Sequence, residues 1–338
     1  MSDTENLILT INTVSTQIIR YLCMFILICG TIGNVSNLIV FLQRPLRSNP
    51  CSIYFFSSSI SGLVALYSGL ITRILATYRL DPTNKSSPLC KIRSFFLYSS
   101  FTTSTWLIAL ASVDRYFISC QNVQRRRFSS LKTTYCLVGI IPVFSVLIYA
   151  EVFYCFEANL PTPRSPLACY SKSYQCDLYN SLTFTIIFVL IPCLIMFLFG
   201  YLTILNIRKL QRTAGTNSAT RSNNNKGTKT IKRSDRQLIQ MLWVQVLLLT
   251  TLALPTAVQR LYSAFTTGIV RGELSLTIEN AIFQVLLLFT HISMSMPFYL
   301  YLLTGILFRR TFIDLFYKVA LIRTIRNAVT VTNIQQNG

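Results

Sequence analysis

The chain has 338 residues, of which 52% are hydrophobic and only 12% are charged, and its mean hydropathy is +0.50. A soluble protein of this size carries about a quarter charged residues, so the composition excludes an ordinary soluble domain and predicts a membrane protein. The net charge of +20 is compatible with nucleic-acid binding, but the positions of the charges argue against it.

Seven apolar stretches are long enough to cross a hydrocarbon core of about 30 Å as α-helices. They cover residues 18–42, 53–78, 92–119, 134–154, 179–207, 238–262 and 278–303. Twenty basic residues lie after the first, third, fifth and seventh stretches, whereas nine lie on the opposite side. By the positive-inside rule the basic side is cytoplasmic, so the N-terminus is predicted to be outside. The charge therefore indicates topology and attraction to the anionic lipid bilayer, and nucleic acid is not an expected partner.

The predicted fold class is an all-α membrane protein, a seven-transmembrane helix bundle followed by a short amphipathic helix. Residues 1–17 are the predicted extracellular N-terminus, 18–319 the membrane domain and 320–338 a cytoplasmic tail. Residues 208–236 form the predicted cytoplasmic third loop, and the polar composition of residues 211–235 within it indicates disorder. Residues 305–318 combine Phe and Leu with Arg and Lys, which is typical of a helix lying on the inner membrane surface.

The third stretch ends in Asp114-Arg115-Tyr116. An adjacent acid and base at the end of a membrane helix are costly to remove from water, which marks a candidate functional site. The alternative is an arginine that extends to the lipid headgroups beside an unrelated aspartate. Cys90 lies twenty-five residues before Arg115. With this spacing the chain resembles rhodopsin-like (class A) G-protein-coupled receptors, whose third helix carries such a cysteine outside and this motif inside.

The resemblance covers about residues 18–319 and implies a coupling site for a heterotrimeric G protein. In the family's resting state the motif arginine, here Arg115, is held by Asp114 and by an acid that matches Asp235. The alternative for Asp235 is an acid favoured by the N-terminal end of its helix. Tyr301 keeps the family's spacing to a following Phe-Arg pair, and Tyr116 completes the residues implied in coupling.

Among the positions that depart from the family's pattern, three lie in the second, sixth and seventh helices. Its second-helix acid, twenty-eight residues after Asn34, is replaced by Gly62; since a sodium ion needs carboxylate oxygen, the usual sodium site is predicted to be missing. The sixth-helix tryptophan is replaced by Ala253, and Pro297 stands where the family has an asparagine. These departures leave open a receptor that is active without a ligand.

Four of the ten cysteines lie toward the outside, where disulfides persist, and they allow three pairings. The resemblance implies that Cys90 pairs with Cys169 or Cys176, and that Cys155 takes the one that remains. The sequon beginning at Asn84 lies in a predicted extracellular loop and is therefore a candidate glycosylation site.

Polar residues in the outer halves of the spans are candidates for a ligand cavity. Amine receptors carry an aspartate eighteen residues before the motif arginine, and because Leu97 occupies that position the resemblance argues against a cationic amine. Arg73 either extends to the headgroups or lines a water-filled cavity, and His291 is either a buried imidazole or a ligand contact. No grouping of His and Cys suits a metal, and neither a metal nor a cofactor is expected. The candidate cavity residues are Arg73, Leu97, Gln259, Arg260, Gln284 and His291.

The sequence as a whole favours a receptor that carries an extracellular signal, from a peptide, to a G protein. Residues 43–52, QRPLRSNPCS, resemble a segment of invertebrate FMRFamide-type neuropeptide receptors. The alternatives are a transporter or channel, or a constitutively active or chemosensory receptor with a small-molecule ligand. Because no catalytic constellation occurs in the spans, an enzyme is not expected.

Overall fold

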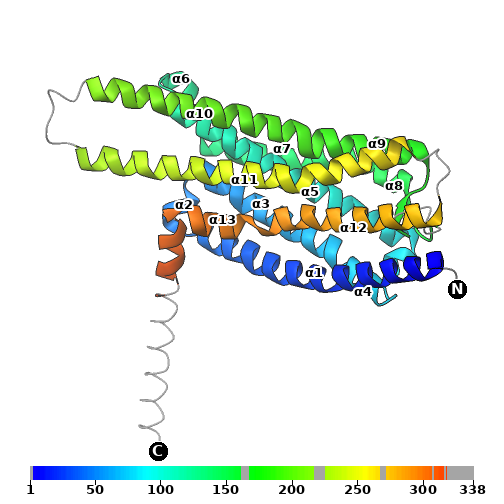
Figure 1. Ribbon diagram of the computed structural model, residues 1–338. Coiled ribbons are helices and arrows are strands. Elements are labelled where there is room, and N and C mark those ends of the chain that lie inside the picture. The colour runs from blue at the N-terminus through cyan, green and yellow to red at the C-terminus, as the bar shows by residue number, and fades with distance from the viewer. Residues whose placement is uncertain are drawn as a thin grey trace, which may run out of the picture.

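A computed structural model describes residues 3–160, 167–216, 225–266, 272–306, 308–315 and 317, and gives no side-chain description for residue 45 or residues 210–242. Within the described residues, seven helices are long and apolar enough to cross a membrane. They lie side by side as a bundle (Figure 1). The predicted seven-transmembrane helical fold is confirmed.

Four spans are single helices, and the second, fourth and fifth contain short non-α segments. The first span is α1 (Asp3–Phe41) and the third is α5 (Ser87–Ser119). The second comprises α3 (Pro50–Leu66), the π-helical η1 (Tyr67–Ile71) and α4 (Thr72–Thr77); the fourth comprises α7 (Leu131–Ile148), the 3₁₀ turn η3 (Tyr149–Glu151) and α8 (Val152–Cys155). The fifth comprises α9 (Tyr174–Thr183), the π-helical η4 (Phe184–Leu190) and α10 (Ile191–Thr216). The sixth lies in α11 (Asn225–Phe265), and the seventh is α12 (Glu273–Ser295), followed by α13 (Pro297–Thr304).

The bundle has two distinct ends (Figure 1). The inner end, on the left, carries α2 (Arg44–Arg47), α6 (Val123–Arg126) and the Asp114-Arg115-Tyr116 motif. The outer end, on the right, carries the start of α1, the turn η2 (Pro82–Asn84) and an antiparallel hairpin of β1 (Phe156–Glu157) and β2 (Tyr170–Ser171). The names inner and outer follow the predicted orientation, in which the basic side of the bundle faces the cytoplasm.

The helices extend beyond the predicted spans. Helix α1 begins at Asp3 rather than near residue 18, and its acidic first turn, with Asp3 and Glu5, suits the positive end of the helix dipole. At the inner end α10 continues to Thr216 and α11 begins at Asn225, so both enter the segment whose composition predicts disorder. Residues 308–315 are helical, within the predicted amphipathic segment, and the predicted tail lies outside the described residues.

Helix α5 is the centre of the bundle. It packs against α3, α7 and α10, and 72% of its most apolar window is buried. Between Ser99 and Thr105 it carries a run of buried small hydroxyl residues, which let neighbouring backbones approach closely. Across this contact the Ser58 and Ser104 hydroxyls lie 2.8 Å apart. The close packing fixes the position of the motif at the end of α5.

Asn34 links the first and seventh spans. Its Nδ2 donates to the carbonyl oxygens of Gly30 (2.9 Å) and Met294 (3.1 Å). Gly62 faces the same amide: a Cβ added there would lie 3.1 Å from Asn34 Oδ1. A carboxylate at position 62 would therefore require Asn34 to move, so the asparagine and the glycine fit together as a pair.

Candidate functional site

Arg115 is buried at the inner end and is held by two other residues. Its Nη2 lies 3.1 Å from Asp114 Oδ2 and 2.6 Å from Asn49 Oδ1. The other carboxylate oxygen of Asp114 accepts a 2.5 Å hydrogen bond from Ser129 Oγ. The charge pair is thus both buried and hydrogen-bonded, which is the condition under which such a pair is tolerated away from water.

Local structure explains why Asn49 and Ser129 reach the motif. Asn49 caps the start of α3, where Pro50 occupies the first turn, and its side chain also accepts from the amide of Cys51. Ser129 lies in the short connection between α6 and α7. Both were missed from the sequence; the Asn-Pro pair signals a helix start but does not reveal what else the cap would bind. The motif consequently ties α5 to the second span and to this connection.

The other residues of the predicted coupling site lie in different surroundings. The Tyr116 ring packs edge-on against Phe199 of α10 at 5.3 Å, and Arg125 Nη1 donates to its hydroxyl at 3.3 Å. Asp235 lies on α11, but its side chain is outside the described residues, so its predicted pairing with Arg115 stays a prediction.

A small cavity lies beside Arg115 and is lined in part by Gly200 of α10 and Trp243 of α11. A Cβ at Gly200 would lie 3.2 Å from the indole ring, so the glycine makes room for the tryptophan. Tyr201, the neighbouring tyrosine, is 56% exposed and does not reach this cavity. Trp243 therefore occupies the position between α10 and α11 next to the motif arginine.

Tyr301 closes a second contact between spans at the inner end. It is buried, and its hydroxyl donates to Gln245 Oε1 of α11 at 2.7 Å. Its ring packs against Phe41, Phe55 and Phe308 at centroid distances of 4.9 to 5.9 Å. Gln245 was missed from the sequence, although an amide within the sixth span is the kind of polar intrusion that signals a specific contact. The hydrogen bond joins the sixth and seventh spans.

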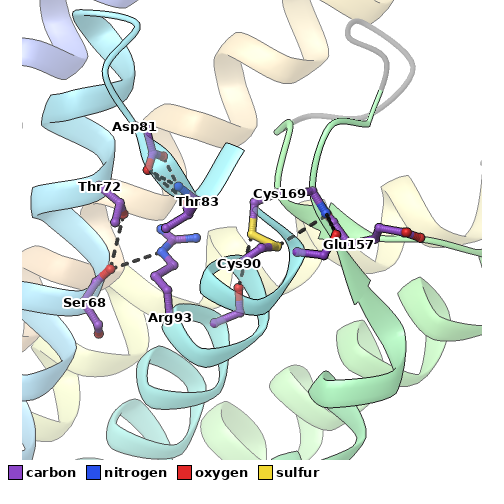
Figure 2. The surroundings of a disulfide bond; sticks show 11 residues. Ser68, Thr72, Asp81, Thr83, Cys90, Arg93, Glu157 and Cys169 are labelled. Atoms are coloured by element: carbon purple, nitrogen blue, oxygen red, sulfur yellow. Dashed lines mark hydrogen bonds between the residues drawn. A yellow bond between two sulfur atoms is a disulfide. The ribbon is translucent and has the colours of Figure 1, made fainter. Parts of the chain in front are cut away.

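At the outer end, two disulfides fix the hairpin to the helices. Cys90 of α5 is bonded to Cys169, which precedes β2, and Cys155 at the end of α8 is bonded to Cys176 of α9. Of the two partners left open for Cys90, the structure selects Cys169. Figure 2 shows this bond together with Arg93, one turn further along α5, whose Nε donates to the Ser68 carbonyl of η1 at 3.1 Å.

Four of the predicted cavity residues gather below the hairpin. Arg73 Nη1 donates to the carbonyl oxygen of Gln284 at 3.2 Å. His291 is fully buried, and its Nδ1 lies 2.8 Å from the Leu287 carbonyl oxygen. Gly69 of η1 lies close to both His291 and Leu97. A Cβ added at Gly69 would meet the imidazole ring and approach Leu97 within 3.0 Å, so the glycine makes room for both side chains.

Arg260 of α11, a fifth predicted cavity residue, is only 1% exposed and lies in an aromatic environment. Its guanidinium carbon is 4.6 Å from the Phe184 ring centroid and 5.1 Å from that of Tyr98. It donates to Asn180 Oδ1 at 2.8 Å and to the Tyr98 hydroxyl. Gln259, the sixth predicted residue, is half-buried beside it. Tyr98, Asn180 and Phe184 were missed, since only spatial contact with Arg260 distinguishes them from packing residues.

In the part of the chain that the structure describes, no group of three His, Cys, Asp or Glu side chains could hold a metal ion. The described residues form two separate sites, an arginine cluster at the outer end that contacts α5 at Tyr98 and a buried ion pair at the inner end of α5.

Comparison with known proteins agrees with this architecture. The family described as "7 transmembrane receptor (rhodopsin family)" matches residues 33–328. The neuromedin U receptor homolog nmur-2 of Caenorhabditis elegans is 26% identical over 149 residues, which are 44% of this chain and 36% of that protein. Human C-C chemokine receptor type 8 is 27% identical over 175 residues (50% and 47%), and human olfactory receptor 1M1 is 24% identical over 168 residues (45% and 52%). The chain thus spans about half the length of these relatives or less. Because the family match covers most of the chain, the chain belongs to the rhodopsin family of seven-transmembrane receptors.

Proposed function

We propose that this multi-pass plasma-membrane protein is a G-protein-coupled receptor that carries the signal of an extracellular peptide to a heterotrimeric G protein. Membership in a receptor family means that the chain is not an enzyme. The observation that carries the proposal is Arg115, a buried cation at the inner end that is bonded to Asp114 of its own helix and to Asn49 at the start of α3.

In the proposed mechanism a ligand at the outer end favours one of two helix arrangements. In the arrangement described here, Arg115 is bound to Asp114 and Asn49, and Tyr301 is bound to Gln245. In the signalling arrangement Arg115 leaves its partners and contacts the G protein, and α11 separates from the Tyr301 hydroxyl. Asp235 is a further resting-state partner of Arg115 in this proposal, and Tyr116 lies at the same surface.

Two observations support a peptide as the ligand. The relatives include proteins named as receptors for neuromedin U and for C-C chemokines. The disulfide-bonded hairpin at the outer end also offers backbone groups with which an extended peptide could pair. Because residues 43–52 resemble a segment of FMRFamide-type receptors, peptides of that type belong in the first panel to be tested.

The test is nucleotide exchange on a panel of G proteins, with pooled neuropeptides added to membranes that carry the wild type or Arg115→Ala. We expect ligand-stimulated exchange in the wild type and a loss of at least about tenfold in the variant, because the cation proposed to contact the G protein is gone. Arg79→Ala, at the outer end, is the matched control at equal surface expression and should signal normally. Equal signalling by Arg115→Ala and wild type would refute this assignment.

The proposed topology predicts that Asn84 carries a glycan. Asn84 ends the turn η2 at the outer end, and its side chain is partly exposed. Glycosidase treatment should increase the gel mobility of the wild type but not of Asn84→Gln. Glutamine keeps the side-chain amide and removes only the glycan acceptor. A glycan on a sequon inserted at residues 217–224, with none at Asn84, would show the opposite orientation.

A further inference from the structure

Two buried arginines at the outer end, Arg73 and Arg260, form no ion pair with a carboxylate in the part of the chain that the structure describes. Arg73 and Arg260 are 5% and 1% exposed, and neither has a carboxylate within 4.0 Å among the described residues. Both reach the same turn of α12: Arg73 donates to the Gln284 carbonyl, and Arg260 lies 5.8 Å from the ring of Phe283. Burying a cation without an anion costs several kcal/mol, so two such cations that reach the same turn of one helix require an explanation.

Arg73 does not extend to the lipid headgroups, because its side chain is buried inside the bundle. Its Nη1 has one carbonyl partner, and its Nε and Nη2 have none. The charged groups within electrostatic range of it include Arg93 and Arg260, which repel it. Arg73 is thus a buried cation among cations.

Arg260 is better surrounded but also incomplete. Aromatic rings and the Tyr98 hydroxyl stabilise its charge, yet its Nε has no partner. Asp177 attracts Arg260 electrostatically but lies beyond ion-pair distance of it, and its carboxyl group also interacts with the Tyr170 hydroxyl. Burial raises the pKa of Tyr170 well above its usual range, so this phenol stays neutral and supplies no negative charge.

His291 contributes differently. Its Nδ1 faces the Leu287 carbonyl oxygen, which can only accept, so the neutral ring carries its proton on Nδ1. The Nε2 atom is then an acceptor without a partner, facing Gly69. A neutral His291 therefore supplies no hydrogen-bond donor for an anion at this site.

We infer that Arg73 and Arg260 together bind a carboxylate group of the ligand, an inference that rests on the proposed receptor function. Three guanidinium nitrogens are without partners, namely Nε and Nη2 of Arg73 and Nε of Arg260. A carboxylate offers two oxygens with about four lone-pair directions, and it matches the planar fork of arginine. The carboxylate comes from a peptide C-terminus, an acidic side chain or a small organic acid.

The hairpin encloses this site. Tyr170 of β2 packs edge-on against Phe283 at 6.0 Å, and Phe283 in turn faces Arg260. Cys169, adjacent to Tyr170, holds the strand to α5. A ligand carboxylate bound to the arginines would lie beneath the hairpin and away from bulk water, where its attraction to them is least screened.

The signalling experiment compares wild type with Arg73→Gln, Arg73→Lys, Arg260→Gln and Arg20→Gln. Arg20 is the matched control, because it is a half-buried arginine at the outer end whose donors already bond to Thr77. The probes are succinate and the individual peptides of the pool, each tested as the free acid and as the C-terminal amide. For the active probe we expect about a hundredfold loss of potency in Arg73→Gln and Arg260→Gln, a smaller loss in Arg73→Lys, and no change in Arg20→Gln.

The form of the probe identifies the source of the carboxylate. If the peptide loses activity when its C-terminus is amidated, the carboxylate is the peptide C-terminus. If the amidated peptide stays active but loses activity when its Asp or Glu is replaced by Asn or Gln, the carboxylate is an acidic side chain. If succinate is active, the ligand is a small organic acid. If Arg115→Ala abolishes signalling while Arg73→Gln and Arg260→Gln keep wild-type potency, the receptor function stands and the carboxylate site is wrong.

Thermal unfolding of the purified full chain in nanodiscs tests the site without signalling. Without carboxylate, Arg73→Gln should unfold at a higher temperature than wild type, because an unpaired buried cation is removed. Succinate, compared with chloride at equal ionic strength, should raise the unfolding temperature of wild type and of Arg20→Gln but not of Arg73→Gln. If Arg73 has only a structural role, Arg73→Gln should unfold at a lower temperature than wild type in the absence of carboxylate. Equal effects of succinate on the unfolding temperature of all variants would overturn the inference.

Discussion

In the Asp114→Asn variant, ligand-independent nucleotide exchange is expected to rise about tenfold, and the free energy of unfolding to fall by about 3 kcal/mol. The substitution keeps the shape of the side chain but removes the negative charge 3.1 Å from Arg115. Removing one partner of a buried ion pair leaves the other charge uncompensated, and Asn49 offsets only part of that loss. Arg115 is then released toward the proposed G-protein surface.

Asp314→Asn is the control for this prediction. It makes the same chemical change on an exposed aspartate of the segment that follows α13 at the inner end. We expect wild-type basal exchange and stability from it, since exposed charges contribute little. Basal exchange in Asp114→Asn equal to that of wild type, at matched expression, would contradict the proposed role of the ion pair.

Removing the Cys90–Cys169 disulfide, by replacing both cysteines with alanine, is expected to destabilise the receptor by about 4.5 kcal/mol in the chain-entropy model. The bond closes a loop with a sequence separation of 79 residues. Surface expression should fall, and any receptor that reaches the surface should bind its ligand weakly because the hairpin is no longer fixed to α5. Thermal unfolding and a surface-labelling assay measure the two effects.

The second disulfide provides the internal comparison. Cys155 and Cys176 close a separation of only 21 residues, for which the same model gives about 3.3 kcal/mol. Replacing this pair with alanine should therefore cost less stability than replacing Cys90 and Cys169. Recovery of a peptide that links Cys90 to Cys176 in mass spectrometry would show that the pairing described here is wrong.

The sequence was sufficient to predict the seven spans and the motif, because both depend on local patterns. Length and hydropathy identify a membrane helix, and Asp114-Arg115 is conspicuous at the end of one. Residues 3–17 continue α1, but their polar composition gives no hydropathy signal from which this extension of the helix could be predicted.

The partners of these residues could not be predicted from the sequence. In the sequence, Asn49 is recognisable only as a helix cap and Gln245 only as a polar residue in a span. They bind Arg115 and Tyr301 because of the way the helices pack. The choice of Cys169 over Cys176 depends in the same way on the path of the hairpin. The predicted roles of the site residues in coupling and ligand binding remain to be tested by the variants above.

The hydrogen bond from Tyr301 to Gln245 also sets a scale for signalling efficacy. A buried hydrogen bond contributes about 0.5–1.5 kcal/mol, so its loss changes the ratio of two helix arrangements by a factor of about 2 to 13. A ligand that prefers the arrangement without this bond by less than that margin would leave most molecules at rest and act as a partial agonist. Full agonism requires a differential affinity that exceeds this bond and the Arg115 contacts combined.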